Sequence, residues 1–379
     1  MDSGTFLAKR GVQYALPANR NKLLDILRDV WHPTDNPKGY LNLGVAENLL
    51  IDGPALGYGD SFSGSHRLKG VLAAFLTRHL RAVRPIQAAD LAVTSGAFPY
   101  NLSNRAGLRP VFVSFHGEDP FGPESVVEYE RALLEARDKG IIVRALLLCN
   151  PHNPLVCASR QVLISYMELC QKYGLHLISD EIYGLSCWDN PETPKAPGFH
   201  SVLSIDHDGI INPALVHVIW GISKDLGMNG VRLGCVVSQN NQNLIRALQT
   251  NSIFTCPSSF ADRITTVMLS DSSFINHFVA ENRYRLRTRY AEAAATLKRN
   301  GISYRRSNAA FFLWADLFSF WSPRMGSSYS SREAMAFVTT GGSSGSEEPG
   351  WFRITFALDR DYVHEGLARV VLALKSFEV

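Results

Sequence analysis

Between residues 91 and 238, short apolar segments alternate with amphipathic ones, and no other feature of the chain limits its fold as strongly. The amphipathic residues 160–174 carry Leu163, Met167 and Cys170 at helical spacing. The short segments are apolar on both faces, as strands buried between helices are. This arrangement predicts an α/β fold with a mainly parallel central sheet flanked by helices. The strand-like segments cover residues 144–150, 175–180, 216–223 and 233–238.

The pattern changes after Pro257. Residues 258–300 have one apolar helical face, and a final helix is expected from near Asp361. The Ser/Gly-rich residues 339–350 predict a loop. This half of the chain therefore predicts a smaller α+β unit. Its strand-like segments are residues 309–317 and 351–358.

We expect two domains from these patterns. The large domain covers residues 50–258, and the small domain combines residues 1–49 with residues 259–379. A chain of 379 residues is long enough to build two hydrophobic cores.

The composition disfavours several classes of protein. With 19% charged residues and a net charge of +3, the chain lacks the basic tracts that bind nucleic acids or membrane surfaces. No apolar run reaches membrane-spanning length, and the first residues lack the apolar stretch of a signal peptide, so a cytoplasmic location is the expectation. The six cysteines form no CxxC pair and no zinc-ligand spacing, which predicts free thiols and no metal site.

Polar motifs follow three of the strand-like segments, at the point where each segment ends. NPHNP (150–154), DEIYG (180–184) and SKDLG (223–227) are weak signals when taken alone, because turns, helix caps and solvated lysines have similar sequences. The carboxyl ends of parallel strands meet at one edge of a sheet, where ligands bind. We therefore expect the three motifs to form one site.

The residue types in these motifs suit pyridoxal 5′-phosphate (PLP). PLP needs an amine for a Schiff base, a carboxylate that keeps its ring nitrogen protonated, and hydrogen-bond donors for its phenolic oxygen. Its phosphate needs backbone N–H groups, hydroxyls and a cation. A lysine desolvated in such a site has a lowered pKa, which makes its neutral, nucleophilic form accessible.

Ordered motifs across most of the chain resemble one family. The sequence is similar to the fold type I PLP-dependent aminotransferases, and within them to the subgroup of 1-aminocyclopropane-1-carboxylate (ACC) synthase-like proteins. This resemblance implies the α/β fold that the segment pattern predicts. The motifs are GYLNLGVAEN (39–48), YGDSFSGSHRLKGVLAAFL (58–76), CNPHNPL (149–155), HLISDEIYGLS (176–186), VIWGISKDLGMNGVRLG (218–234), AAFFLWADL (309–317) and EEPGWFRITFA (347–357).

The resemblance assigns four residues to the reactive part of PLP. Lys224 matches the lysine that forms the Schiff base and serves as acid and base at the substrate Cα. Asp180 matches the carboxylate at the pyridine nitrogen. Asn153 and Tyr183 match the partners of the phenolic oxygen. All four belong to the motifs at the predicted strand ends.

Phosphate binding is implied for a second set of residues. Ser223 and Arg232 match phosphate ligands, while Gly96 and Ala97 belong to the segment that begins the phosphate cup. Tyr58 resembles the tyrosine that reaches the phosphate of the other subunit, which implies a homodimer.

Three further residues are implied to contact an amino-acid substrate. Arg353 matches the arginine that binds the substrate α-carboxylate, a role that suits its planar guanidinium. Glu47 and Asn48 lie in the N-terminal segment that borders the substrate in this subgroup. The expected partners are therefore a small-molecule amino acid and a second copy of the chain, without nucleic acid or membrane.

The chain departs from the family pattern after residue 97. The helix and the strand that normally separate the phosphate cup from the NPHNP motif are absent from the sequence, and Tyr100 is the remaining candidate for the aromatic residue that stacks on the ring. The segment 334–351 is also shortened. We expect the large domain to lack that helix and strand, and with them part of the support for the phosphate.

The expected function is that of a PLP-dependent enzyme acting on an L-amino acid or a derivative. An aminotransferase, placed in specialised (secondary) metabolism, is the first hypothesis. A PLP-dependent carbon–sulfur lyase or an ACC synthase-type lyase is the second, and a non-catalytic, truncated family member is an alternative of another class. An NAD-dependent enzyme is disfavoured because no GxGxxG motif follows a predicted strand.

Overall fold

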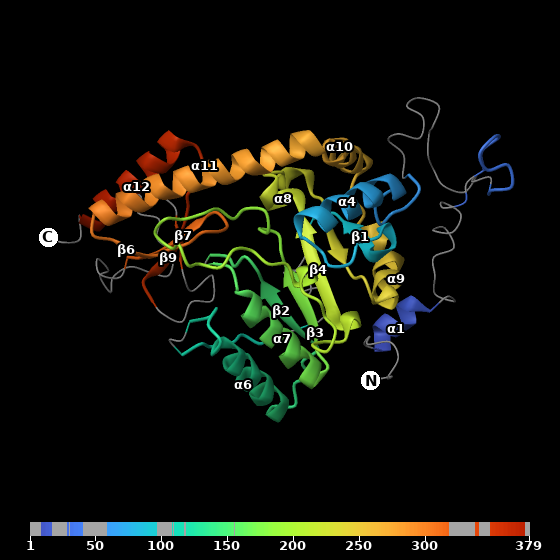
Figure 1. The fold of residues 1–379 in the computed structure, drawn as a ribbon, viewed down its shortest axis with the longest axis horizontal. Helices are drawn as coiled ribbons and strands as arrows, with labels where there is room; N and C mark the ends of the chain where they lie inside the picture. The colour runs from blue at the N-terminus through green and yellow to red at the C-terminus, as the bar shows by residue number, and fades with distance from the viewer. Residues whose placement is uncertain are drawn as a thin grey trace.

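Two β-sheets organise the molecule (Figure 1). The computed structural model describes residues 9–16, 29, 31–40, 59–96, 108, 110–116, 119–154, 156–317, 338–340 and 349–375. The five-stranded sheet has the order β1-β5-β4-β3-β2 and contains β1 (Leu91–Thr94), β2 (Ala145–Cys149), β3 (His176–Asp180), β4 (Val216–Gly221) and β5 (Gly234–Val237). The four-stranded sheet has the order β6-β7-β9-β8 and contains β6 (Ser303–Arg305), β7 (Phe312–Asp316), β8 (Thr339–Thr340) and β9 (Trp351–Thr355).

Helices cover the sheets and connect them. The described α-helices are α1 (Lys9–Ala15), α4 (His66–His79), α6 (Ser125–Asp138), α7 (Arg160–Tyr173), α8 (Ile222–Asp225), α9 (Gln242–Thr250), α10 (Ser259–Ser270), α11 (Ser272–Arg299) and α12 (Arg360–Lys375). The described 3₁₀ helices are η3 (Ala88–Asp90), η4 (Val202–Ser204), η5 (Pro213–Leu215), η6 (Asn229–Val231) and η7 (Ser252–Phe254).

The larger sheet has the predicted, mainly parallel character. Strands β2, β3 and β4 are parallel, whereas β5 is antiparallel to both β4 and β1. Strand β1 therefore points the same way as β2, β3 and β4, and β5 alone is reversed. The connection from Gly221 to Gly234 contains only the four-residue α8 and the short η6, so it has no helix long enough to run back along the sheet as a parallel crossover usually does.

The predicted elements are confirmed with one exception. The strand-like segments of the first half became β2, β3, β4 and β5, and residues 160–174 form α7. The residues 258–300 form α10 and α11. The loop predicted for residues 339–350 was wrong at Thr339 and Thr340, which form β8 because they pair with Arg353 and Phe352 of β9.

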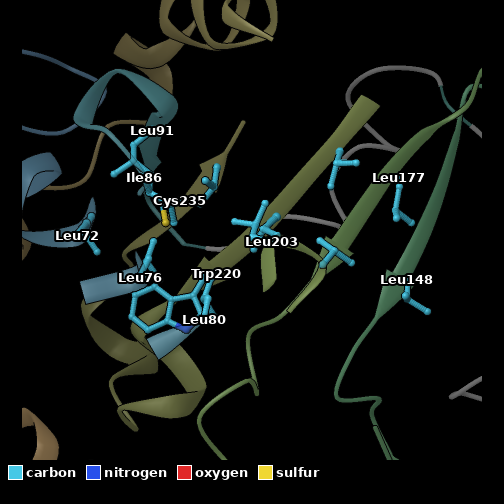
Figure 2. Packing of buried hydrophobic residues seen from close by; sticks show 14 of the residues in the cluster. Leu72, Leu76, Leu80, Ile86, Leu91, Leu148, Leu177, Leu203, Trp220 and Cys235 are labelled. Atoms are coloured by element: carbon cyan, nitrogen blue, oxygen red, sulfur yellow. The ribbon is translucent and has the colours of Figure 1, made fainter. Parts of the chain in front are cut away.

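The largest hydrophobic core lies between the five-stranded sheet and its helices. Leu68, Leu72 and Leu76 repeat every four residues along α4 and are fully buried, as is Trp220 of β4. Figure 2 shows Leu76 beside Trp220 in this cluster. Burial of each such leucine stabilises the fold by roughly 1.5–3 kcal/mol. This core fixes β4, and β4 leads directly into α8.

Helix α11 belongs to both halves of the molecule. Ile275 and Val279 at its beginning pack in the large core, while Leu286, Tyr290 and Leu297 pack in a second cluster with the four-stranded sheet and α12. Figure 1 shows α11 extending along one side of the molecule past both sheets. The domain division at residues 258 and 259 stays a prediction, as does the loss of a helix and strand after residue 97.

Three further observations concern the part of the chain that the structure describes. None of its helices is long and apolar enough to cross a membrane. It also contains no group of three or more metal-ligating side chains. The six cysteines are free thiols, of which Cys157, Cys170 and Cys235 are buried.

Candidate active site

The three polar motifs meet at the carboxyl ends of β2, β3 and β4. Asp180, the last residue of β3, is paired with Cys149 of β2 and with Ile219 of β4, so the three strands end at nearly the same level. The NPHNP motif follows β2, the Tyr183 turn follows β3, and α8 follows β4. The register of the sheet therefore brings the three motifs to one edge, as the sequence predicts.

Lys224 lies in α8, a single helical turn directly after β4. The turn ends at Gly227, whose N–H donates to the Lys224 carbonyl at 2.9 Å and whose φ of +66° favours glycine. Lys224 is half-buried, and burial is the main cause of its lowered pKa. The charges of Arg353 and Arg232 lower the pKa further, while Asp180 opposes them. This environment favours the neutral amine.

Asp180 supplies a half-buried carboxylate beside Lys224. Burial raises its pKa to about 6, while the Ile182 N–H, which donates to Oδ1 at 3.3 Å, and the charge of Lys224 act in the opposite direction. A cationic partner stabilises the charged form of a carboxylate that is largely shielded from solvent. The side chain therefore suits a protonated heterocyclic nitrogen.

Arg353 reaches this edge from β9 of the smaller sheet. Its Nη1 donates to Asn153 Oδ1 at 3.0 Å and its Nη2 donates to Thr339 Oγ1 at 3.4 Å. The guanidinium carbon lies 4.5 Å from the ring centroid of Phe312. Its Nε is buried and has no hydrogen-bond partner among the described residues. Arg353 thus joins the two sheets at the site and keeps a donor for an anion.

Tyr183 lies in the turn after β3 and is almost fully buried. Its ring meets those of Phe311 and Phe312 edge-on, with centroids 5.3 and 6.0 Å away. Burial is the main cause of its raised pKa, and the nearby charge of Arg353 acts in the opposite direction. The phenol therefore stays protonated and can donate a hydrogen bond.

Gly96 and Arg232, both predicted phosphate residues, lie in direct contact. A Cβ on Gly96 would overlap Arg232 Nη2, and the φ of Gly96 is +102°. Arg232 Nη1 donates to the Asn229 carbonyl at 2.9 Å, and the residue is exposed. A side chain at residue 96 would require the Arg232 guanidinium to move, and the positive φ favours glycine. Ser223, buried and adjacent to Lys224, completes the described part of the predicted phosphate set.

Five predicted residues lie outside the described residues, so their roles stay predictions. They are Glu47, Asn48, Tyr58, Ala97 and Tyr100. The eight described ones all lie at the same edge of the large sheet, at the adjoining turn after β1, or on β9 facing it.

The sequence interpretation missed residues that support the site from beneath. Glu181 is fully buried, and its Oε1 accepts from Ser179 Oγ and the Val202 N–H, both at 2.9 Å. Burial raises its pKa to about 7. Asp225 is also buried and follows Lys224. Glu181 follows Asp180 and Asp225 follows Lys224, so the sequence signal for both was an acidic residue directly beside a predicted site residue.

The described residues fit PLP in charge and in chemistry. The Arg232 guanidinium, which lies against Gly96, suits the PLP phosphate. The half-buried carboxylate of Asp180 suits the ring nitrogen, and Lys224, whose pKa is lowered, suits the aldehyde. Arg353 provides a further unpaired donor at the same edge.

Comparison with known proteins agrees with this geometry. The model of the family "Aminotransferase class I and II" matches residues 102–370. An aromatic aminotransferase from Pyrococcus horikoshii has a similar structure, with a TM-score of 0.66 at 21% identity over 86% of this chain and 89% of that one. The fold is therefore that of the fold type I aminotransferases.

Two curated relatives extend the match. "Probable aminotransferase aclI" from Aspergillus oryzae is 30% identical over 98% of this chain and 99% of its own length. "1-aminocyclopropane-1-carboxylate synthase-like protein 1" from Takifugu rubripes is 28% identical over 92% of this chain, which spans 64% of that protein. The chain belongs to the class I and II aminotransferase family, whose members depend on PLP.

Proposed function

We propose that this chain is a PLP-dependent aminotransferase that acts on an L-α-amino acid or a derivative of one. The observation that carries the proposal is the position of Lys224, half-buried among the charges of Arg353, Arg232 and Asp180, with a lowered pKa. A lysine amine must be neutral to act as a base or nucleophile, and this environment favours that form.

The cofactor would be held by residues from several elements. Arg232, Gly96 and Ser223 would hold the phosphate, since they offer a cation, close backbone approach and a hydroxyl. Asp180 would hold the protonated ring nitrogen, and Asn153 and Tyr183 would lie toward the phenolic oxygen. When bound, PLP supplies an electron sink that makes the substrate Cα–H acidic.

The substrate would be oriented by Arg353. Its unpaired Nε and the Nη groups form the planar donor edge that a carboxylate matches. Lys224 Nζ would then take the proton from Cα and return it to a different atom. Lys224 is half-buried, which limits the solvent around its amine.

A lyase of the ACC synthase type is the second candidate. The Takifugu relative, named as ACC synthase-like, supports it. The full-length match to the Aspergillus protein, which is named a probable aminotransferase, favours the aminotransferase. Both reactions share the Lys224 proton transfer and differ in what leaves the substrate afterwards.

We also propose a homodimer, because apolar side chains are exposed beside the predicted phosphate residues. Ile253, Phe254 and Phe260 are 40%, 83% and 63% exposed. They flank Thr255, whose carbonyl accepts from the Ser95 N–H at 2.7 Å, next to Gly96. A second subunit on this surface would cover the aromatic rings. Sedimentation of wild type and Phe254→Asp tests this, with monomers expected only for the variant.

Product analysis tests the proposed reaction. Purified protein with PLP is offered each L-amino acid or S-adenosylmethionine, with an α-keto acid as amino acceptor. Keto-acid product that needs the acceptor supports an aminotransferase, while ammonia, a thiol or ACC formed without it supports a lyase. Wild-type protein that folds, binds PLP and yields no product from any of these would contradict both.

A further inference from the structure

Asp225 is the neighbour of Lys224 in α8, and the two side chains lie in opposite environments. Asp225 is 1% exposed, whereas Lys224 is half-buried at the site. A carboxylate in the core requires compensating hydrogen bonds. Its partners therefore indicate what the residue does.

Three donors converge on the Asp225 carboxylate. The Leu185 N–H and the indole Nε1–H of Trp220 both donate to Oδ2 at 3.0 Å, and Ser186 Oγ donates to Oδ1 at 2.7 Å. Trp220 comes from β4, while Leu185 and Ser186 come from the segment after β3. One side chain thus connects the ends of two neighbouring strands.

Helix α11 completes the arrangement. Asn282 Nδ2 donates to the Asp225 carbonyl at 3.4 Å, and Arg283 Nε donates to the Leu185 carbonyl at 2.9 Å. The turn that carries Lys224 and the segment that carries Tyr183 are therefore both bonded to α11. Leu185 lies two residues after Tyr183, so the carboxylate links the turn that carries Lys224 to the backbone just after Tyr183.

We propose that Asp225 is a positioning residue that holds Lys224 against the Tyr183 turn through these bonds. The inference rests on the proposed function of Lys224 and adds a residue to it. Asp225 would not touch cofactor or substrate, and no proton would pass through it. Its contribution is to direct Lys224 toward Asp180 and away from solvent.

A comparison of Asp225→Asn with Asp225→Ala separates the effect of the hydrogen bonds that position Lys224 from the effect of the Asp225 charge. Asp225→Asn removes the same charge as Asp225→Ala but keeps the volume and an acceptor oxygen for Leu185 and Trp220. The amide NH₂ would face Ser186 Oγ, whose hydroxyl can accept instead of donate. The difference between the two variants therefore measures the positioning of Lys224.

Asp90→Ala is the matched control for the loss of a buried carboxylate. Asp90 is 7% exposed and accepts from the Gln87 N–H at 2.9 Å and from Gln242 Nε2 at 3.2 Å. It precedes β1, at the sheet edge opposite to the site. Its removal lowers stability without altering Lys224.

The first measurement is the apparent pKa of Lys224, from the pH dependence of its labelling by an amine reagent in protein without PLP. Asp225→Ala is expected to raise this pKa toward that of an ordinary lysine, whereas Asp225→Asn and Asp90→Ala keep it low. The second is PLP affinity and turnover. Asp225→Ala should weaken PLP binding about tenfold and lower kcat roughly 100-fold, with the asparagine variant within a fewfold of wild type.

An unchanged labelling pKa and turnover in Asp225→Ala, with a loss of Tm equal to that of Asp90→Ala, overturns the positioning role. If Asp225→Ala does not fold, Ser186→Ala and Trp220→Phe each remove one donor and should raise the labelling pKa; no rise in either also overturns it. Labelling needs no cofactor, so wild-type protein that takes up no PLP contradicts the proposed function while the role of Asp225 is still decided.

Discussion

Lys224 and Arg353 approach the same site from the two sheets, but they are held in different ways. Lys224 lies on a turn whose flanking residues, Ser223 and Asp225, are buried in the large core. Arg353 lies in β9, paired with Trp314 of β7 and Thr339 of β8, and its guanidinium contacts Asn153, Thr339 and the ring of Phe312. The proposed reacting amine is thus placed by a single turn with buried neighbours, whereas the guanidinium proposed to bind substrate is placed by a strand and oriented by side chains that single substitutions can change.

Replacing Lys224 should have the largest effect. Lys224→Ala should lower kcat by about 10³–10⁴-fold, because its amine is the proposed acid and base at the substrate Cα. The fold should persist, since the side chain is half-buried and removes no core packing. Steady-state kinetics beside Lys172→Ala, an exposed lysine paired with Glu130, checks this. Equal activity of the two variants would exclude Lys224 as the base.

Arg353→Ala should damage substrate binding more than cofactor binding. Loss of the guanidinium should lower kcat/KM by roughly 100-fold, mostly through KM, because a buried carboxylate then loses its partner. PLP affinity should change much less. The control is Arg305→Ala, whose guanidinium lies over Trp351 on the smaller sheet. Unaltered amino-acid kinetics in Arg353→Ala would reject the assignment.

The Asp180 carboxyl predicts how PLP affinity depends on pH. Its pKa is raised to about 6, so it is charged above that pH and neutral below it. A neutral carboxyl cannot hold a cationic ring nitrogen, so affinity should fall about tenfold per pH unit below pH 6. In Asp180→Asn this dependence should be absent and affinity low throughout. Titration of PLP binding by fluorescence between pH 5 and 8 measures it.

Gly96→Ala should have the smallest effect of the four. The new methyl group would meet the guanidinium of Arg232 in a backbone conformation that disfavours alanine, so PLP affinity should fall up to about tenfold. Gly198→Ala is the control, because nothing lies within 4 Å of its added Cβ. If the two variants bind PLP equally, the Arg232 contact is not part of the phosphate site.

Local sequence predicts the strands and the residues at their ends, but not the contacts between distant segments. Apolar runs and their polar endings located Asp180 and Lys224 correctly at one sheet edge. The bond between Arg353 and Asn153 joins residues 200 positions apart, and no pattern within either segment indicates it. The Asp225 network was missed for the same reason, because its donors come from other elements.

The reversal of β5 and the pairing of β8 are two further features that local sequence does not predict. The strand character of residues 233–238 is local, whereas their direction depends on the short connection from β4. Thr339 and Thr340 directly precede a Gly/Ser-rich run in the sequence, and they form a strand because they pair with Arg353 and Phe352 of β9.

The most direct test of the account is to find which lysine reacts with PLP. Purified protein is given PLP, its visible absorption is recorded, and the complex is reduced with borohydride, digested and mapped by mass spectrometry. The account predicts a visible band and a single modified peptide carrying the cofactor on Lys224. A folded protein that shows no band, or that carries the cofactor on surface lysines such as Lys172 instead, would contradict it.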